Sequence, residues 1–328
     1  MRKLAFITAA LLVLSSPALA FDCGKASTDV EKLICAHPDL VAIDDQMAAA
    51  YDTRKGDLPA AGRALLQTSQ RGFIRRRENC SGGSEDENVT CIRKDTLGRL
   101  ALLSGQPLEG EGTAGDLRPV FVQRDPDKHH YRVEVDLMKF EQPSSKGELI
   151  FNAEIDKRLA AIPLGKTDET VPDGIEYGYQ QSATLNYASP RLVSMTLEGY
   201  QDSGGAHGSG WTDVINVDLK SGRVMTFDDT FSDGAAGQLI ESCVTQLISQ
   251  KTERFGTENP FEPKMLDEFR PEIEKLVMNL NKWALSAGGA AVIFDPDDAG
   301  SHAEGGYSCN FGHDDLQPLL RAGRLLPD

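Results

Sequence analysis

Residues 191–219, RLVSMTLEGYQDSGGAHGSGWTDVINVDL, decide how the second half of the chain folds. Apolar and polar side chains alternate along 191–200 and again along 211–219, which is the period of a half-buried β-strand. Between them lie His207 and four glycines, and glycine supplies the positive φ that a turn between antiparallel strands needs. The stretch therefore predicts a β-hairpin within a sheet.

Further strands and two helices surround this hairpin. The alternation recurs at 131–138, and a turn at Ser221-Gly222 leads into another strand. Two amphipathic helices follow, one from Leu239 to Ile248 and one from Leu266 to Trp283, before closing strands at 290–295 and 306–311. Strands followed by helices predict that residues 118–328 form an α+β domain with a largely antiparallel sheet.

The first 104 residues have a different character. Residues 1–20, MRKLAFITAALLVLSSPALA, combine a basic start, an apolar run and a small-x-small end, which predicts a secretory signal peptide cleaved after Ala20. Asp22 before Cys23 argues against a lipid anchor, and no later apolar run is long enough for a membrane span. We expect a periplasmic or secreted protein.

Residues 21–104 predict a small all-α domain of four helices. Thr28 with Glu31 suggests a capping box before the first helix. The second begins near Pro38, the third ends near Cys80, and the fourth covers 92–103. The Gly-rich, acidic stretch 105–117 predicts a linker to the second domain.

Six cysteines in an exported chain predict disulfides. Cys243 lies on the apolar face of a predicted helix and Cys309 in the last strand, so we expect these two to pair. A helical domain with a thin core also needs cross-links. The four cysteines of this domain are Cys23, Cys35, Cys80 and Cys91. They can pair in three patterns, and the sequence does not decide among them.

The charge restricts the class of partner. The formal net charge is −16, so nucleic acid, which requires clustered positive charge, is not an expected partner. The concentrated basic segment, RGFIRRR at 71–77, is best interpreted as a helix face paired with neighbouring acids rather than as a polymer site. A basic protein is the partner that an acidic surface would attract, but charge alone slightly favours the simpler interpretation that the excess of acid keeps an exported protein soluble.

Three motifs that resemble catalytic or metal sites are incomplete. Residues 226–229, TFDD, begin a deacetylase motif, but Thr230 stands where glycine is needed and no His-x-x-x-His follows. Ser209 lacks the glycine spacing of a nucleophile elbow. The acidic run 295–298 suggests a calcium loop, but Gly306 occupies the position of the bidentate glutamate. We expect no catalytic residue, metal or cofactor.

The first region resembles the LprI-type lysozyme-inhibitor family over residues 22–103. The resemblance rests on FDCGKASTDVEKLIC, QRGFIRRRENC and CIRKDTLGRLALL. Gln70, Phe73, Arg77 and Cys80 match the pattern of the third helix, although Phe73 stands where the family normally has Trp.

The second region is similar, over 118–322, to the C-terminal domain shared by the RsiV anti-sigma factor, a lysozyme receptor, and the PdaC peptidoglycan deacetylase. The segments SGGAHGSG and NVDLKSGRVMTFDDTF carry this resemblance. Together the two resemblances imply a non-enzymatic lysozyme-binding or lysozyme-inhibiting protein that protects the cell wall. A peptidoglycan-binding or envelope-stress module is the alternative, and a wall-modifying hydrolase is a weaker one.

We expect the partner to be bound by loop 203–211 between the two hairpin strands, because loops on a rigid sheet lose little entropy on docking. His207 and Trp211 are the expected contacts, and flanking acids would steer a basic partner. The candidate partner-binding residues are Asp202, Gly204, Gly205, His207, Trp211 and Asp213.

Overall fold

The structure is a computed structural model that describes residues 22–124, 131–163, 177–204, 207–256, 263–323 and 326–327. The helices longer than one turn are α1 (Asp29–Ala36), α2 (Pro38–Asp57), α3 (Ala60–Arg77), α4 (Glu85–Ser104), α5 (Lys146–Ala160), α7 (Ala235–Phe255) and α8 (Pro263–Val277). Two short helices are α6 (Phe227–Thr230) and α9 (His313–Leu316). The strands are β1 (Leu117–Arg124), β2 (Tyr131–Phe140), β3 (Tyr177–Ala188), β4 (Leu192–Asp202), β5 (Ser209–Asp218), β6 (Arg223–Val224), β7 (Trp283–Ser286), β8 (Gly289–Phe294) and β9 (Tyr307–Gly312).

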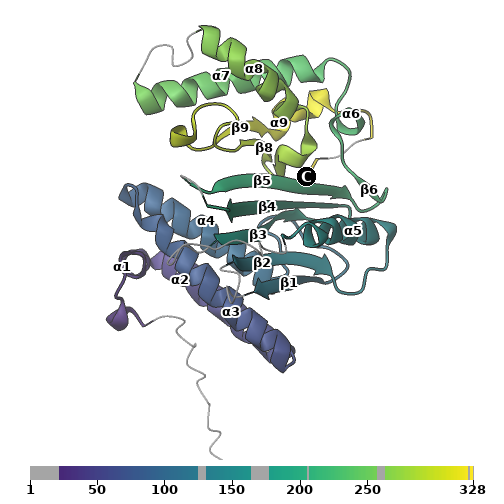
Figure 1. The fold of residues 1–328 in the computed structure, drawn as a ribbon. Coiled ribbons are helices and arrows are strands. Elements are labelled where there is room, and N and C mark those ends of the chain that lie inside the picture. Colours follow the sequence, from purple (N-terminus) through teal and green to yellow (C-terminus); the bar gives the residue numbers. More distant parts are fainter. Residues whose placement is uncertain are drawn as a thin grey trace, which may run out of the picture.

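The strands form two sheets rather than the one that we expected. The larger has the order β1-β2-β3-β4-β5-β6, and the smaller has the order β7-β8-β9 (Figure 1). Neighbouring strands are antiparallel except β2 and β3, which are parallel. Helix α5 follows β2 and returns the chain toward the start of β3, as a parallel pair requires. This helix is a third long one that the sequence pattern of this half did not reveal.

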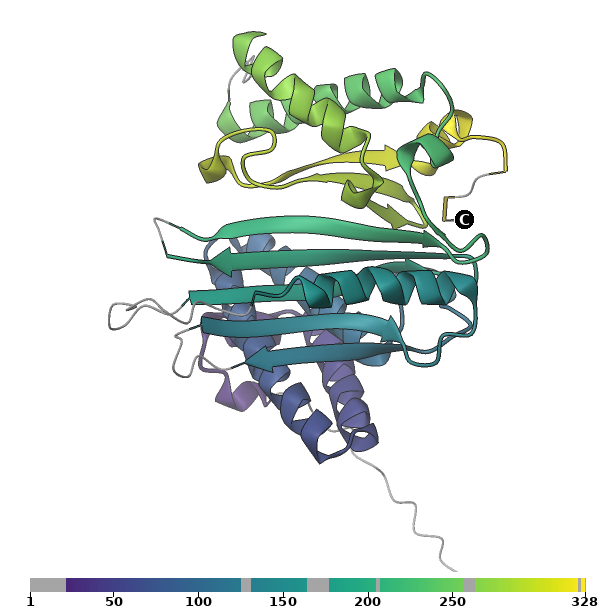
Figure 2. The same ribbon diagram turned by 45° about the vertical axis from the view of Figure 1, so that its right-hand side comes forward.

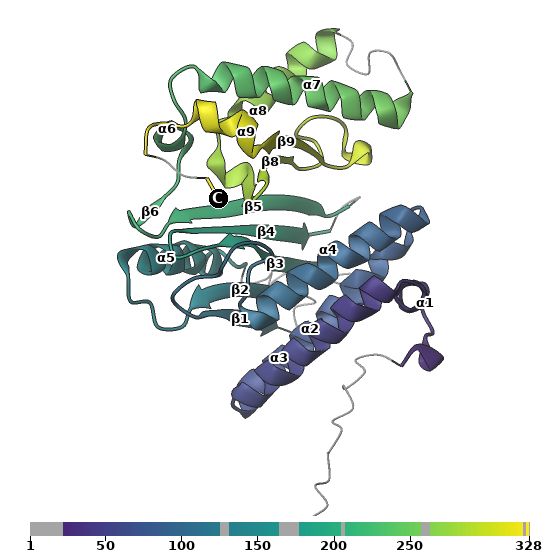
Figure 3. The same ribbon diagram turned by 180° about the vertical axis from the view of Figure 1, so that it is seen from behind.

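Helices cover both faces of the larger sheet (Figures 2 and 3). Alternate residues of β2 therefore point into two different layers. Val133 and Val135 share a hydrophobic core with Phe151 of α5 on one face. Glu134 and Asp136 point to the opposite face, which α3 and α4 cover, and are only 4% and 2% exposed. The polar side of this strand is buried as thoroughly as its apolar side.

A network of charges joins α3 and α4 to this second face. Glu134 accepts hydrogen bonds from Arg75 and Arg76 of α3. Asp136 accepts one from the hydroxyl of Ser69 at 2.9 Å and one from the Arg99 guanidinium of α4 at 3.1 Å. Arg75 and Arg76 of the 71–77 segment thus pair with an acid, as expected, but that acid comes from the sheet, whereas Arg77 pairs with Asp44 of α2.

Two glycines allow the helices to approach the strands closely. A Cβ at Gly72 would lie 2.8 Å from Oε2 of Glu134, and one at Gly98 would lie 2.8 Å from Oγ1 of Thr184. Both distances are shorter than normal packing contacts, so larger residues would force the layers apart.

The helices of the first region confirm most of the expected boundaries. The capping box of Thr28 and Glu31 is present. Helix α4 begins at Glu85 rather than near Ile92, because Ser84 and Glu87 form a second capping box. Phe73 and Arg77 are buried, as expected of core positions.

The predicted linker, 105–117, does not run free of the sheet. The backbone N–H groups of Leu108, Glu109 and Gly112 donate to carbonyl groups near the end of β3. The segment thereby adds to the contact between the helical region and the sheet.

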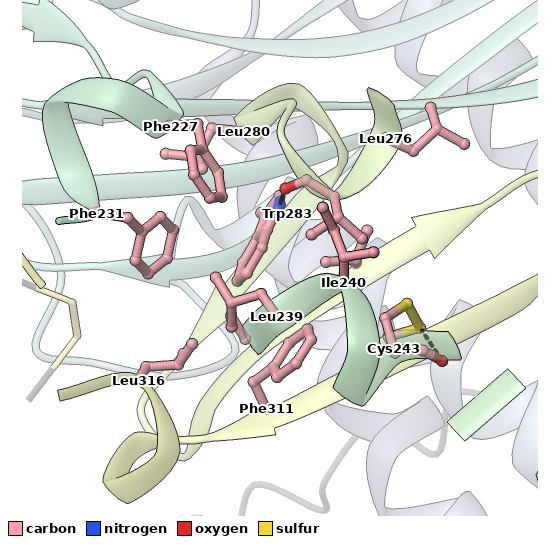
Figure 4. Packing of buried hydrophobic residues seen from close by; sticks show 14 of the residues in the cluster. Phe227, Phe231, Leu239, Ile240, Cys243, Leu276, Leu280, Trp283, Phe311 and Leu316 are labelled. Carbon is pink, nitrogen blue, oxygen red and sulfur yellow. Dashed lines mark hydrogen bonds between the residues drawn. A yellow bond between two sulfur atoms is a disulfide. The ribbon is translucent and has the colours of Figure 1, made fainter. Parts of the chain in front are cut away.

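A second core lies between the smaller sheet and the helices α7 and α8. Trp283 is fully buried there, with its ring 5.2 Å from that of Phe231 and 5.4 Å from that of Phe311 (Figure 4). The expected disulfide between Cys243 and Cys309 joins α7 to β9.

The other disulfides are Cys23–Cys35 and Cys80–Cys91, each local in sequence. Three disulfides are typical of an oxidising compartment and fit an extracytoplasmic protein. The segment 1–20 lies outside the described residues, and none of the described helices is long and apolar enough to cross a membrane.

Three of the edge strands carry features that limit further pairing. Strand β1 carries Pro119, which has no N–H to donate, and β6 has two residues. At β9, Gln246 of α7 donates to the carbonyl of Asn310 and accepts from its N–H, and Gln250 donates to the carbonyl of Ser308.

Candidate functional site

The predicted hairpin is present as β4 and β5, which pair as far as Gln201 and Ser209. At the turn, Gly204 has φ +80° and donates its N–H to the carboxylate of Asp202 at 2.9 Å. This Asx-type turn explains an aspartate two residues before a glycine. Gly205, one of the candidate contacts, lies outside the described residues.

His207 meets a histidine from the connection between β8 and β9 of the smaller sheet. Its ring stacks on that of His302, with 4.1 Å between the centroids. His207 shares a hydrogen bond of 3.0 Å between its Nδ1 and the carbonyl of Gly208, and His302 Nδ1 lies 2.9 Å from the Asp297 carboxylate. Residues 202–204, 207–210 and 295–304 therefore form one surface, which we call the hairpin edge.

Buried polar contacts hold the two parts of the hairpin edge together. Asp295 accepts a hydrogen bond from the N–H of Thr212 at 2.8 Å and from the Lys282 ammonium at 2.6 Å. Lys282 also donates to the carbonyl of Thr212 at 2.7 Å. The ammonium and carboxylate are each less than 15% exposed, so this contact fixes the end of β5 relative to the 295–304 segment.

Trp211 and Asp213 do not join His207. The Trp211 ring lies over Gly199, where a Cβ would come within 2.1 Å of it, and 5.4 Å from the ring of Tyr179. Burial raises the pKa of the Tyr179 phenol, and the nearby Tyr131 and Asp213 add to this effect. The two candidates therefore belong to the face of the sheet that α5 covers, and Trp211 is partly buried there.

The acidic run 295–298 forms a turn closed on itself. The N–H of Asp295 donates to the Asp298 carboxylate at 2.7 Å, and Asp297 has φ +79°. Burial raises the pKa of Asp298, although the Asp295 N–H and Lys282 act in the opposite direction. In the part of the chain that the structure describes, the one group of three potential metal ligands is Cys80, Cys91 and Asp95, and both sulfurs are in a disulfide.

The geometry around His207 does not assemble a hydrolase triad from described residues. Its ring nitrogen contacts a backbone carbonyl rather than a carboxylate, whereas a catalytic histidine needs an orienting acid and a hydroxyl within reach. The contact with His302 gave no signal in the sequence, since the two residues lie in connections between strands of different sheets and 95 positions separate them.

No family model matches this chain, and no curated protein matches it. Among solved structures, a DUF3298 family member from Bacteroides fragilis NCTC 9343 aligns at 13% identity and a TM-score of 0.46, covering 65% of this chain and 96% of that one. A DUF3298 family protein from Pseudomonas aeruginosa PAO1 aligns at 14% identity and a TM-score of 0.45, covering 65% and 97%. The structural neighbours of this chain are thus DUF3298 family proteins, and they assign no activity to it.

Proposed function

We propose that this chain is an exported, non-enzymatic protein that binds a basic partner protein at the hairpin edge. The stacking of His207 on His302 carries the proposal, because it makes a single surface from loops of two sheets. Lysozyme is the partner that the resemblances of both regions suggest. The expected mechanism is steric, with the edge entering or covering the cleft that holds the catalytic carboxylates of lysozyme.

The charge of the hairpin edge supports a basic partner. Asp297, which contacts His302, is well exposed, and Asp202 at the hairpin turn is partly exposed. The whole chain carries a net charge of −16, and such a field accelerates encounter with a cationic protein. Lysozymes are commonly basic, so the electrostatics favour this class.

The rigidity of the hairpin edge also supports a binding role. Asp295, Lys282 and Thr212 fix the end of β5, and Gly204 sits in a turn that Asp202 closes. A surface held in this way loses little conformational entropy when a partner docks.

Calorimetric titration with a C-type and a G-type lysozyme, at low and at physiological ionic strength, tests the proposal. We expect binding that weakens with salt. In a kinetic binding measurement, the double variant Asp202→Asn/Asp297→Asn should lower the association rate constant for lysozyme about tenfold. Asp52→Asn/Glu253→Gln removes the same charge from exposed sites on α2 and α7 and should leave the rate nearly unchanged. Absence of binding to either lysozyme at low salt would contradict the proposal.

Single substitutions distinguish residues that contact the partner from residues that stabilise the fold. His207→Ala and His302→Ala should weaken binding while leaving the unfolding temperature within about 2 °C, since both rings are exposed. Trp211→Ala should lower that temperature, because the ring packs on Tyr179. Sedimentation with purified sacculi, without any effect on lysozyme rates, would instead assign a wall-binding module.

A further inference from the structure

A cavity of about 310 Å³ lies where α3 and α4 meet β3 and β4, and the register of the sheet shows which side chains face it. Ser182 lies opposite Glu198, whose carboxylate accepts a hydrogen bond from Lys94 of α4 at 2.6 Å. Gln180 lies opposite Tyr200, two residues further along the strand pair. Opposite residues of an antiparallel pair share a face, as do alternate residues of one strand. These four sheet residues therefore lie on the face that α4 covers, and all four line the cavity.

The polar side chains of this cavity that remain available to a ligand are uncharged. Five lining side chains make no hydrogen bond to any residue that the structure describes, and each belongs to a half-buried or exposed residue: Asn79, Gln180, Ser182, Thr184 and Tyr200. Their amides and hydroxyls can both donate and accept hydrogen bonds. A ligand with several hydroxyl or amide groups would match them.

The cations of the cavity are already paired. They and their acids are Lys94 with Glu198, Arg76 with Glu134, and Arg99 with Asp136. An anionic ligand would therefore lose hydration without gaining a counter-ion. Asp95 makes no ion pair among the described residues, but Lys94 and Arg76 act electrostatically on its carboxylate, so both would repel a cationic ligand. The carboxylate can instead accept hydrogen bonds from ligand hydroxyl groups.

An apolar lining and an accessible aromatic ring complete the cavity. Phe73, Leu102 and Ala183 supply the apolar lining. Tyr200 is 43% exposed. The tip of its ring rests on Gly208, where a Cβ would lie 2.3 Å from both Cζ and the hydroxyl oxygen of the tyrosine. A ring supported in this way presents a π-face, whose partial negative charge attracts the hydrogens of aliphatic C–H groups.

We propose that this cavity binds an uncharged sugar, with a C–H face of its ring on Tyr200 and its hydroxyl groups on the free amide and hydroxyl side chains. A pyranose ring combines these two features, because its hydroxyl groups lie around its edge and its C–H groups on its faces. Gln180 and Ser182 meet the ligand from β3, and Asp95 meets it from α4. The assignment does not depend on lysozyme binding, and its test contains no lysozyme.

NMR titration of the full-length mature protein with five small molecules tests the chemistry of the ligand. Glucose and N-acetylglucosamine are uncharged rings, glucosamine and glucuronate are charged rings, and mannitol is an uncharged polyol without a ring. We expect at least one uncharged ring to bind with a Kd of about 1–10 mM. This Kd should lie at least about tenfold below those of glucosamine, glucuronate and mannitol.

The outcomes of this titration differ in meaning. Preference for N-acetylglucosamine over glucose would assign an acetylated amino sugar, and the reverse preference a simple hexose. Equal affinity for mannitol would show that the ring face is not recognised. Equal or tighter binding of a charged ring, or no binding of either uncharged ring, would likewise overturn the proposal.

Variants of two lining residues locate the site. Tyr200→Ala should weaken binding of the preferred sugar about tenfold or more, whereas Tyr200→Phe keeps the ring and should retain most of the affinity. Phe255→Ala removes a ring of similar exposure from α7, outside the cavity, and should change nothing. Ser182→Leu fills the cavity from β3 and should abolish binding, with thermal unfolding as the check that the variant is folded.

Two results with these variants would contradict the assignment. Sugar affinity that is unchanged in both Tyr200→Ala and Ser182→Leu would place the ligand elsewhere. Equal losses in Tyr200→Phe and Tyr200→Ala would show that the hydroxyl group, rather than the face of the ring, holds the ligand.

Discussion

The carboxylate of Glu304 accepts a hydrogen bond from the ammonium group of Lys251, a cation of α7 that is only 2% exposed. The same carboxylate accepts a hydrogen bond from the Tyr307 hydroxyl at 2.7 Å and one from the Ser301 N–H at 2.8 Å. The end of the hairpin edge is therefore attached to the core of the smaller sheet through one acid.

Acid should weaken this attachment. Burial alone would raise the pKa of Glu304, but the bonds from Lys251, Ser301 and Tyr307 lower it to about 2. Because the folded pKa lies below the unfolded value, the stabilisation is complete above about pH 4.5 and is lost as the pH falls toward 2. Its size is roughly 3 kcal/mol. In urea denaturation at pH 7, Glu304→Gln should remove most of this stabilisation. It should also make the unfolding free energy fall less steeply between pH 4.5 and 2. Glu253→Gln, on the exposed side of α7, should have neither effect.

Asp136 should be indispensable to the contact between the helical region and the sheet. It is 2% exposed and accepts hydrogen bonds from Ser69, Arg99 and Gln123. Asp136→Asn leaves buried arginine charge without its counter-ion, so we expect a loss of about 3 kcal/mol in unfolding free energy. Asp156→Asn removes the exposed partner of Lys139 and should cost less than about 1 kcal/mol. Equal losses in the two variants would contradict the account.

Replacing Gly98 by alanine should destabilise the protein, although the same replacement normally stabilises a helix. Alanine in place of glycine stabilises an open helix position by about 1 kcal/mol, and Gly237 in α7 has no atom within 4 Å of the added Cβ. At Gly98 the Cβ would meet Thr184 Oγ1 at 2.8 Å, so Gly98→Ala should destabilise by about 1–3 kcal/mol. Thermal unfolding should show that adding Thr184→Ala restores part of this loss, while Gly237→Ala raises the midpoint. A stabilised Gly98→Ala single variant would exclude the close approach.

The disulfide between Cys243 and Cys309 should contribute more to the unfolding free energy than the disulfide between Cys23 and Cys35. It spans 66 residues, against 12 for Cys23–Cys35, and the entropy removed from the unfolded chain grows with loop length. Replacing Cys243 and Cys309 by alanine should cost about 2–5 kcal/mol in denaturant titrations. The corresponding change at Cys23 and Cys35 should cost less, and the reverse order would show that strain or residual structure dominates.

Local patterns predicted the elements that depend on neighbouring residues. The alternation along 191–219 gave the β4–β5 hairpin, and Thr28 with Glu31 gave the start of α1. The apolar face of α7 also placed Cys243 correctly against Cys309. These features are set by side chains within a few residues, or by one face of a helix.

Long-range packing explains what the patterns missed. An alternating strand with Glu134 and Asp136 predicts a solvent-facing side, yet α3 and α4 cover both residues. Only the fold brings arginines from helices 35 or more residues away to those carboxylates. The parallel pairing of β2 with β3, and the contact of His207 with His302, are likewise products of topology.

The treatment of the strand edges limits how any partner can be recognised. Pro119 removes a donor from β1, β6 is too short to extend, and Gln246 and Gln250 occupy the backbone groups of β9. At Pro119 of β1, and at Ser308 and Asn310 of β9, backbone groups with which a foreign strand would pair are missing or already bonded. Addition of a partner strand is therefore disfavoured at these positions. The same features work against strand addition between copies of this chain, the contact from which fibrils grow.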